Sequence, residues 1–112
     1  MIKSLDKISM NVIETSGNGV VNEETIFQFL QKGKKVFAKY EGGKIKRGRL
    51  VGSLIKNVLT FNYFQEQIGG KLDYGYSTCE LTLSSSGKIR LIENFNWASR
   101  KDSDGVNIFE KI

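Results

Sequence analysis

The clearest indication of the fold comes from residues 48–66, which read GRLVGSLIKNVLTFNYFQE. On both sides of Lys56-Asn57, large apolar residues alternate with small or polar ones, and a period of two is typical of β-strands. A two-residue hairpin turn at Lys56-Asn57 predicts the opposite pairs Gly52 with Phe61, Leu50 with Tyr63, and Gly48 with Gln65. Glycine beside a large ring fills space well. The segment therefore predicts two antiparallel strands with an aromatic inner face.

The same pattern continues outward over the rest of the chain. Twelve glycines and no proline, with short turn signals between β-branched and aromatic runs, favour strands over helices. A helix is an alternative only at residues 20–32, where Asn22 could cap it, but the alternation of Phe27 and Phe29 favours a strand. The predicted strands cover residues 8–15, 24–32, 35–40, 44–54, 58–66, 71–83, 88–99 and 106–112.

These eight strands predict an all-β fold in a single domain, residues 1–112. Short connections favour an antiparallel up-and-down meander, which leaves two unpaired edges unless the first strand meets the last. We therefore expect a small closed barrel, an architecture of the kind seen in lipocalins and streptavidin. Such a barrel has a lumen that side chains fill or that holds one small ligand. A strongly bent open sheet is the alternative.

Two turns set the register of the remaining strands. A strict two-residue loop at Gly42-Gly43 would place Arg47 on the face of Ala38 and Tyr40, so either this face is solvated or a bulge shifts the phase before Gly48. A four-residue loop over residues 84–87 predicts the opposite pairs Tyr74 with Trp97, Tyr76 with Phe95, and Thr78 with Glu93. That register stacks aromatic rings on the inner face.

Composition excludes several kinds of chemistry. Histidine is absent and Cys79 is the single cysteine, which removes intrachain disulfides and the commonest metal ligands and general bases. We expect Cys79 to be buried filler, and we expect no metal site, no cofactor and no catalytic residues. Residues 1–6 lack the features of a secretory signal, and no apolar run is long enough to span a bilayer. We therefore expect a cytoplasmic protein that does not act at a membrane.

Two carboxylates on apolar faces indicate a candidate ligand site. Glu93 shares a face with Leu91, Phe95 and Trp97, and Glu110 shares one with Ile108. A buried carboxylate needs a cation, a hydrogen bond or a wet cavity. The predicted lumen site comprises Tyr63, Gln65, Tyr76, Glu93, Trp97 and Glu110.

The site has three alternatives. Both carboxylates could lie in water at the barrel mouth, or a closed network could satisfy them through waters, Arg47 or Arg49. A pair of carboxylates could also serve acid–base catalysis of the glycosidase kind, although such enzymes are seldom this small.

The chain also has a basic sector from Lys32 to Lys56. Nine lysines and arginines and one acid, Glu41, give it a charge of +8, and since the whole chain carries +5, the remainder carries −3. The sector is either a solvated outer face or an anion-binding surface centred on Lys46, Arg47 and Arg49. Phe37 and Tyr40 could stack on bases of a single strand, but no RNA-binding signature is present, so we do not expect nucleic acid as the partner.

Three spaced segments resemble those of a family of small bacterial proteins often named N-acetylglutamate synthase. They are Thr25-x-Phe27, Ala38-x-Tyr40-x-Gly42-Gly43-x-Ile45-x-x-Gly48-x-Leu50-x-Gly52, and Gly87-x-Ile89-Arg90-Leu91-x-Glu93-x-Phe95-x-Trp97. The resemblance implies an N-acetyltransferase as an alternative function. Acetyltransferases bind acetyl-CoA with Gln/Arg-x-x-Gly-x-Gly/Ala between a strand and a helix, whereas the nearest string here, residues 49–54, ends in leucine and lies in a predicted strand. The favoured function is a non-enzymatic barrel that binds a small ligand in its lumen, and the oligomeric state stays open.

Overall fold

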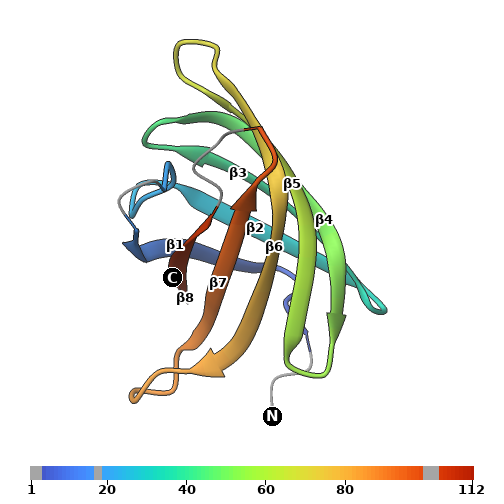
Figure 1. The fold of residues 1–112 in the computed structure, drawn as a ribbon. Coiled ribbons are helices and arrows are strands. Elements are labelled where there is room, and N and C mark those ends of the chain that lie inside the picture. Colours follow the sequence, from blue (N-terminus) through green and yellow to red (C-terminus); the bar gives the residue numbers. More distant parts are fainter. Residues whose placement is uncertain (1–3, 17–18, 100–103) are drawn as a thin grey trace.

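The chain folds into a closed barrel of eight antiparallel strands (Figure 1). The structure, a computed structural model, describes residues 4–16, 19–99 and 104–112. The strands are β1 (Ile8–Thr15), β2 (Ile26–Lys32), β3 (Lys35–Gly42), β4 (Ile45–Ile55), β5 (Val58–Gln67), β6 (Leu72–Leu83), β7 (Ile89–Trp97) and β8 (Asp104–Lys111). Each strand pairs with the next, and β8 pairs with β1. The predicted meander and its closure are confirmed, with strand boundaries within two residues of the expected ones.

The hairpin of β4 and β5 has the predicted register. Lys56 adopts a positive φ of 57° in the turn, and Gly52 lies opposite Phe61, Leu50 opposite Tyr63 and Gly48 opposite Gln65. A Cβ atom on Gly52 would lie 2.6 Å from the Cα atom of Phe61. Glycine at this position therefore allows β4 to pass close to the aromatic strand.

A β-bulge follows Tyr40, as one of the two alternatives at Gly42-Gly43 predicted. The register shifts between Tyr40, which pairs with Gly48, and Gly42, which pairs with Ile45. This shift turns Arg47 to the outside of the barrel, where its guanidinium reaches solvent. The ring of Tyr40 lies over Gly48, where a Cβ atom would be only 2.2 Å from Tyr40 Cε2.

The predicted register of β6 against β7 is wrong by one residue. Leu83 pairs with Ile89, so the connection comprises residues 84–88 rather than 84–87, and Ser84 N donates to Lys88 O (2.8 Å). Gly75, Ser77 and Cys79 consequently lie opposite Trp97, Phe95 and Glu93. The rings of Tyr74 and Tyr76 point outward and are 50 % and 55 % exposed.

Space inside the barrel explains this register. A Cβ atom on Gly75 would lie 2.6 Å from Tyr63 Oη, so the inner face of β6 needs small residues where β5 and β7 supply rings. Trp97 is buried, as predicted, but its ring contacts Tyr63 (5.7 Å between centroids) and Phe95 (5.3 Å) edge to face rather than Tyr74.

The lumen has two halves of different chemistry. The turns between β4 and β5 and between β6 and β7 lie at one end (bottom of Figure 1), and the loop between β5 and β6 lies at the other. Leu5, before β1, is fully buried, and its N–H donates to Gln31 Oε1 (2.7 Å). Toward the first end the buried side chains are apolar, and this apolar half comprises Leu5, Phe29, Val36, Leu54, Leu59, Cys79, Leu81 and Leu91. The polar half comprises Tyr40, Tyr63, Gln65, Asp73, Ser77, Glu93, Trp97 and Asn107.

Other expectations have mixed outcomes. Residues 26–32 form a strand and not a helix, and Cys79 is buried as predicted. The predicted turn at residues 102–105 lies partly outside the described residues. So do residues 1–6, on which the expectation of a cytoplasmic protein rests. In the described ranges, no helix is long and apolar enough to cross a membrane.

Candidate functional site

The carboxyl group of Glu93 is the centre of a buried polar cluster. Ser77 Oγ donates to Glu93 Oε2 (2.5 Å) and Asn107 Nδ2 donates to Glu93 Oε1 (2.8 Å). The register brings them together, because Glu93 pairs directly with Cys79 and Asn107, and Ser77 lies two residues before Cys79 on the same face. All three side chains are buried. Three strands thus converge on one carboxyl group inside the barrel.

Burial sets the ionisation of this carboxyl group. Desolvation raises the pKa of Glu93, and the hydrogen bonds from Ser77 and Asn107 offset part of that rise. Each carboxylate oxygen accepts one of these bonds, so the group is held in a fixed orientation.

Asn107 leaves one acceptor of the cluster unused. The side chain is 4 % exposed, and within the described residues its Oδ1 has no hydrogen-bond partner. A buried acceptor without a donor costs about 1–3 kcal/mol. The cluster therefore offers a free acceptor beside the Glu93 carboxyl group.

A second polar chain runs along the lumen from β3 to β6. Tyr40 Oη donates to Gln65 Oε1 (2.8 Å), while Gln65 Nε2 and Gln67 Nε2 donate to Asp73 Oδ2 at 3.3 and 2.8 Å. Burial, followed by the nearby Glu93, raises the pKa of Tyr40 well above its usual value. The Tyr40 phenol therefore stays neutral and donates, and its bond links β3 to the Gln65–Asp73 pair.

Aromatic rings surround the Glu93 cluster and nearly fill the space beside it. The rings are those of Phe27, Tyr40, Phe61, Tyr63, Phe95, Trp97 and Phe109. The space between them measures about 20 Å³, as the volume open to the centre of a water molecule, which is room for about one water.

A segment outside the strands closes this space. Val20 and Val21, between β1 and β2, line it and are buried. The following turn is tied to the β3–β4 connection, because Thr25 Oγ1 donates to Gly42 O (3.1 Å) and accepts from Asn22 N (3.1 Å). The two valines therefore occupy the mouth of the polar half.

Residues 3–112 match one family model, that of avidin-like proteins. The chain belongs to the avidin-like protein family. Comparison with curated proteins and with solved structures returned no significant match.

This membership corrects the resemblance to the family named N-acetylglutamate synthase, which is wrong. The spaced glycines and aromatics that carried the resemblance have a packing role in the avidin-like barrel. Gly48 lies beneath Tyr40, and Gly52 lies against Phe61. The spacing thus reflects ring-against-glycine contacts inside a barrel.

Four of the six predicted lumen residues lie together in the avidin-like barrel, and two do not. Tyr63, Gln65, Glu93 and Trp97 line the space described above. Tyr63 Oη donates to the carbonyl oxygen of Asn96 (2.9 Å). Tyr76 is outside because of the register of β6 and β7.

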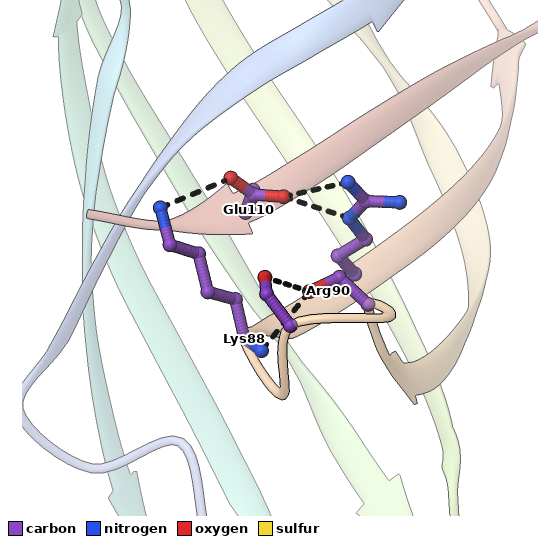
Figure 2. A network of polar contacts seen from close by, with 5 residues as sticks. Lys88, Arg90 and Glu110 are labelled. Carbon is purple, nitrogen blue, oxygen red and sulfur yellow. Dashed lines mark hydrogen bonds and ion pairs between the residues drawn. The ribbon is translucent and has the colours of Figure 1, made fainter.

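Glu110 is also on the outer surface (Figure 2). It pairs with Arg90 across β7 and β8, and its carboxylate accepts from Arg90 (2.8 Å) and lies 3.6 Å from Lys88 Nζ. Arg90 is the main cause that lowers the pKa of Glu110. The inward positions of β8 are Asn107 and Phe109, so the two glutamates lie on opposite sides of the sheet and cannot act as a catalytic pair.

The predicted anion-binding residues lie on the outer face of β4. Glu66 forms ion pairs with two of them, through Arg47 Nε (2.9 Å) and Lys46 Nζ (3.8 Å). Neither Arg47 nor Arg49 enters the lumen network. Tyr40 is buried and cannot stack on a base, whereas Phe37 is exposed.

Sequence reasoning missed Asp73, Ser77 and Asn107, and it considered Tyr40 only as a ring that could stack on a base. One signal could have found Ser77, because Gly75, Ser77 and Cys79 are small residues at alternate positions, like Gly48 and Gly52 beside the rings of their neighbours. In the part of the chain that the structure describes, no group of three acidic or cysteine side chains could hold a metal ion.

Proposed function

We propose that this avidin-like barrel binds a small molecule in the polar half of its lumen. The ligand carries N–H or O–H donors for Asn107 Oδ1 and the Glu93 carboxyl group, and a flat apolar body that packs between the rings of Tyr63, Phe95 and Trp97. Polar anchors at the closed end of an aromatic pocket are the usual composition of a small-molecule site.

The observation that carries this proposal is the buried Oδ1 of Asn107. Within the described residues it accepts no hydrogen bond, although Nδ2 of the same amide is engaged with Glu93. A structural residue at this position would be apolar or fully bonded, because an unused buried acceptor destabilises the fold. A ligand donor would satisfy it.

Val20 and Val21 occupy part of the space that the ligand would fill. They line the same space from a segment outside the strands, and the remaining volume of about 20 Å³ is too small for anything larger than water. Binding therefore requires these two side chains to move out of the mouth. Their apolar surface would be exchanged for that of the ligand.

The family supports the same kind of ligand, since avidin-like barrels are typical binders of small, biotin-like molecules. Biotin has a cyclic urea, whose two N–H groups are donors of the required kind, and it is the natural probe.

The test is calorimetric titration of biotin into the wild-type chain and into the double variant Val20→Ala/Val21→Ala. We expect binding to both, and tighter binding to the double variant because less apolar surface must be displaced. Glu93→Leu should abolish binding while the chain still melts cooperatively, and Glu93→Gln should weaken it with little effect on folding. Glu110→Gln, a change on the outer face, is the matched control and should bind like wild type.

Two outcomes contradict the proposal. One is the absence of biotin binding by both the wild type and the double variant. The other is a Glu93→Leu variant that binds as wild type does. A large loss of stability in Glu93→Leu without any binding in wild type would make the cluster a closed structural network instead.

A further inference from the structure

A groove on the outside of the barrel is separate from the lumen. It lies over β2 and β3, between residues 7–9 and β4. Its volume, again as the space open to the centre of a water molecule, is about 530 Å³. Its apolar part is a continuous row across three strands, because Leu30 pairs with Phe37 and Phe37 pairs with Val51. All three side chains are substantially exposed.

The groove also has a cationic part. Lys39 and Arg49 lie directly opposite each other on β3 and β4, and Lys7 lines the same groove. None of the ion pairs among residues 4–16, 19–99 and 104–112 involves these three side chains. Like charges that face each other across strands destabilise a sheet, so an anion between Lys39 and Arg49 would relieve their repulsion.

The cationic part continues away from the apolar row. A neighbouring hollow of about 370 Å³ shares Gln28, Lys39 and Arg49 with the groove and extends to Arg47 and Glu41. Arg47 is already engaged by Glu66 (2.9 Å). Lys39 and Arg49 are therefore the charges available to a ligand. They lie next to the apolar row on the same face, because Lys39 is two residues from Phe37 on β3 and Arg49 is two residues from Val51 on β4.

We propose that this groove is a second binding site, for a free aliphatic carboxylate of the medium-chain fatty-acid class. The carboxylate lies between Lys39 and Arg49, and the alkyl chain lies along Leu30, Phe37 and Val51. Charge complementarity and the order of the two parts favour this occupant. A single nucleic-acid strand needs several exposed rings to stack on, and the groove offers Phe37 alone among the described residues, because Phe29 is buried.

The first experiment is titration calorimetry of the wild-type chain with hexanoate, octanoate and decanoate below their micelle concentrations. The affinity should rise up to about fourfold with each added methylene. This factor corresponds to the free energy of about 0.8 kcal/mol gained when one CH₂ group is buried. Acetate, which has the charge without the chain, should bind at least about tenfold more weakly than decanoate. Decan-1-ol, which has the chain without the charge, should bind about fivefold more weakly, because an exposed ion pair contributes up to about 1 kcal/mol.

The second experiment locates the site. Lys39→Glu/Arg49→Glu and Phe37→Ser should each weaken decanoate binding at least about tenfold, and Val51→Ser repeats the apolar test should Phe37→Ser fail to fold. Matched changes elsewhere on the outer face, Lys111→Glu and Val58→Ser, should bind decanoate like wild type. Glu93→Leu should also bind it normally, because the lumen is a different site.

Several results would overturn the proposal. Equal affinity for decanoate and decan-1-ol would remove the role of the charges, and loss of binding in Glu93→Leu would place the fatty acid in the lumen. Sedimentation that shows a dimer for wild type and a monomer for Phe37→Ser, with no decanoate bound, would make the groove an interface between two copies. Tight binding of oligo(dT) that decanoate does not displace, with no decanoate bound, would make it a nucleic-acid surface.

Discussion

The two halves of the lumen share the same strands but differ in how completely their side chains are satisfied. In the apolar half, Leu59 and Leu91 are fully buried among other aliphatic and aromatic groups, and Leu5, before β1, is fully buried in the same core. In the polar half, five buried polar or charged side chains, Gln65, Asp73, Ser77, Glu93 and Asn107, share a few hydrogen bonds, and Asn107 Oδ1 has no partner within the described residues. One half is packed from apolar side chains alone, and the other contains a buried acceptor that no donor among the described residues satisfies.

This difference indicates where the free energy of folding comes from. Burial of apolar surface contributes about 25 cal/mol per Å², and the apolar half gains it without any opposing polar cost. In the polar half, desolvation of Glu93 and Asn107 opposes the gain from the surrounding rings. The apolar half therefore stabilises a barrel that also contains an unfavourable buried polar cluster.

Truncation of the apolar half should have the largest effect. Phe29 is 1 % exposed, so Phe29→Ala should lower the free energy of unfolding by about 3–5 kcal/mol. Phe64, 51 % exposed on the outer face, is the matched control, and Phe64→Ala should change stability by less than about 1 kcal/mol. Urea denaturation measures both. Similar losses in the two variants would show that the apolar half is not the main source of stability.

The pH dependence of stability should distinguish the polar half. Because the pKa of Glu93 is raised in the folded state, the folded chain binds this proton more tightly than the unfolded chain. The contribution of Glu93 to stability is therefore fully present below about pH 4.5 and decreases as pH rises toward the folded pKa. The slope cannot exceed about 1.4 kcal/mol per pH unit for one proton.

Denaturation of wild type and Glu93→Gln between pH 4 and 8 isolates this effect. The stability of wild type relative to Glu93→Gln should fall with rising pH. Glu110 provides the opposite case, because its lowered pKa gives a contribution that is present above about pH 4.5 and is lost as pH falls through the folded pKa. A relative stability of wild type and Glu93→Gln that is constant with pH would mean that Glu93 is hydrated.

The strand register could be predicted from the sequence only where the turn allowed a single loop length. Lys56-Asn57 allowed one loop length, so the register of β4 and β5 followed, and with it the inward positions of Tyr63 and Gln65. The connection at residues 84–88 allowed two lengths, and a change of one residue exchanges the two faces of a strand. Tyr76 was consequently placed inside and Ser77 was missed.

The inward face of β8 was predicted wrongly for a related reason. Val106, Ile108 and Ile112 are apolar residues at alternate positions, with Glu110 among them, yet Asn107 and Phe109 are the inward residues. Outer faces of this barrel carry many apolar side chains, so alternation alone did not identify the core face. Asn107, the residue with the free acceptor, therefore had no signal of its own.

The observed register of β6 and β7 predicts a smaller effect, a coupling between Trp97 and rings on the inner face but not between Trp97 and rings on the outer face. Trp97 and Tyr63 contact edge to face at 5.7 Å, and such aromatic pairs are worth about 0.5–1.5 kcal/mol beyond the area they bury. A double-mutant cycle of Trp97→Leu with Tyr63→Leu should therefore show a coupling free energy in this range. The same cycle of Trp97→Leu with Tyr74→Leu should be additive, because Tyr74 lies on the other face of the sheet. Urea denaturation of the single and double variants measures both cycles. Coupling to Tyr74 and none to Tyr63 would restore the four-residue loop at residues 84–87, and it would turn Ser77 away from Glu93.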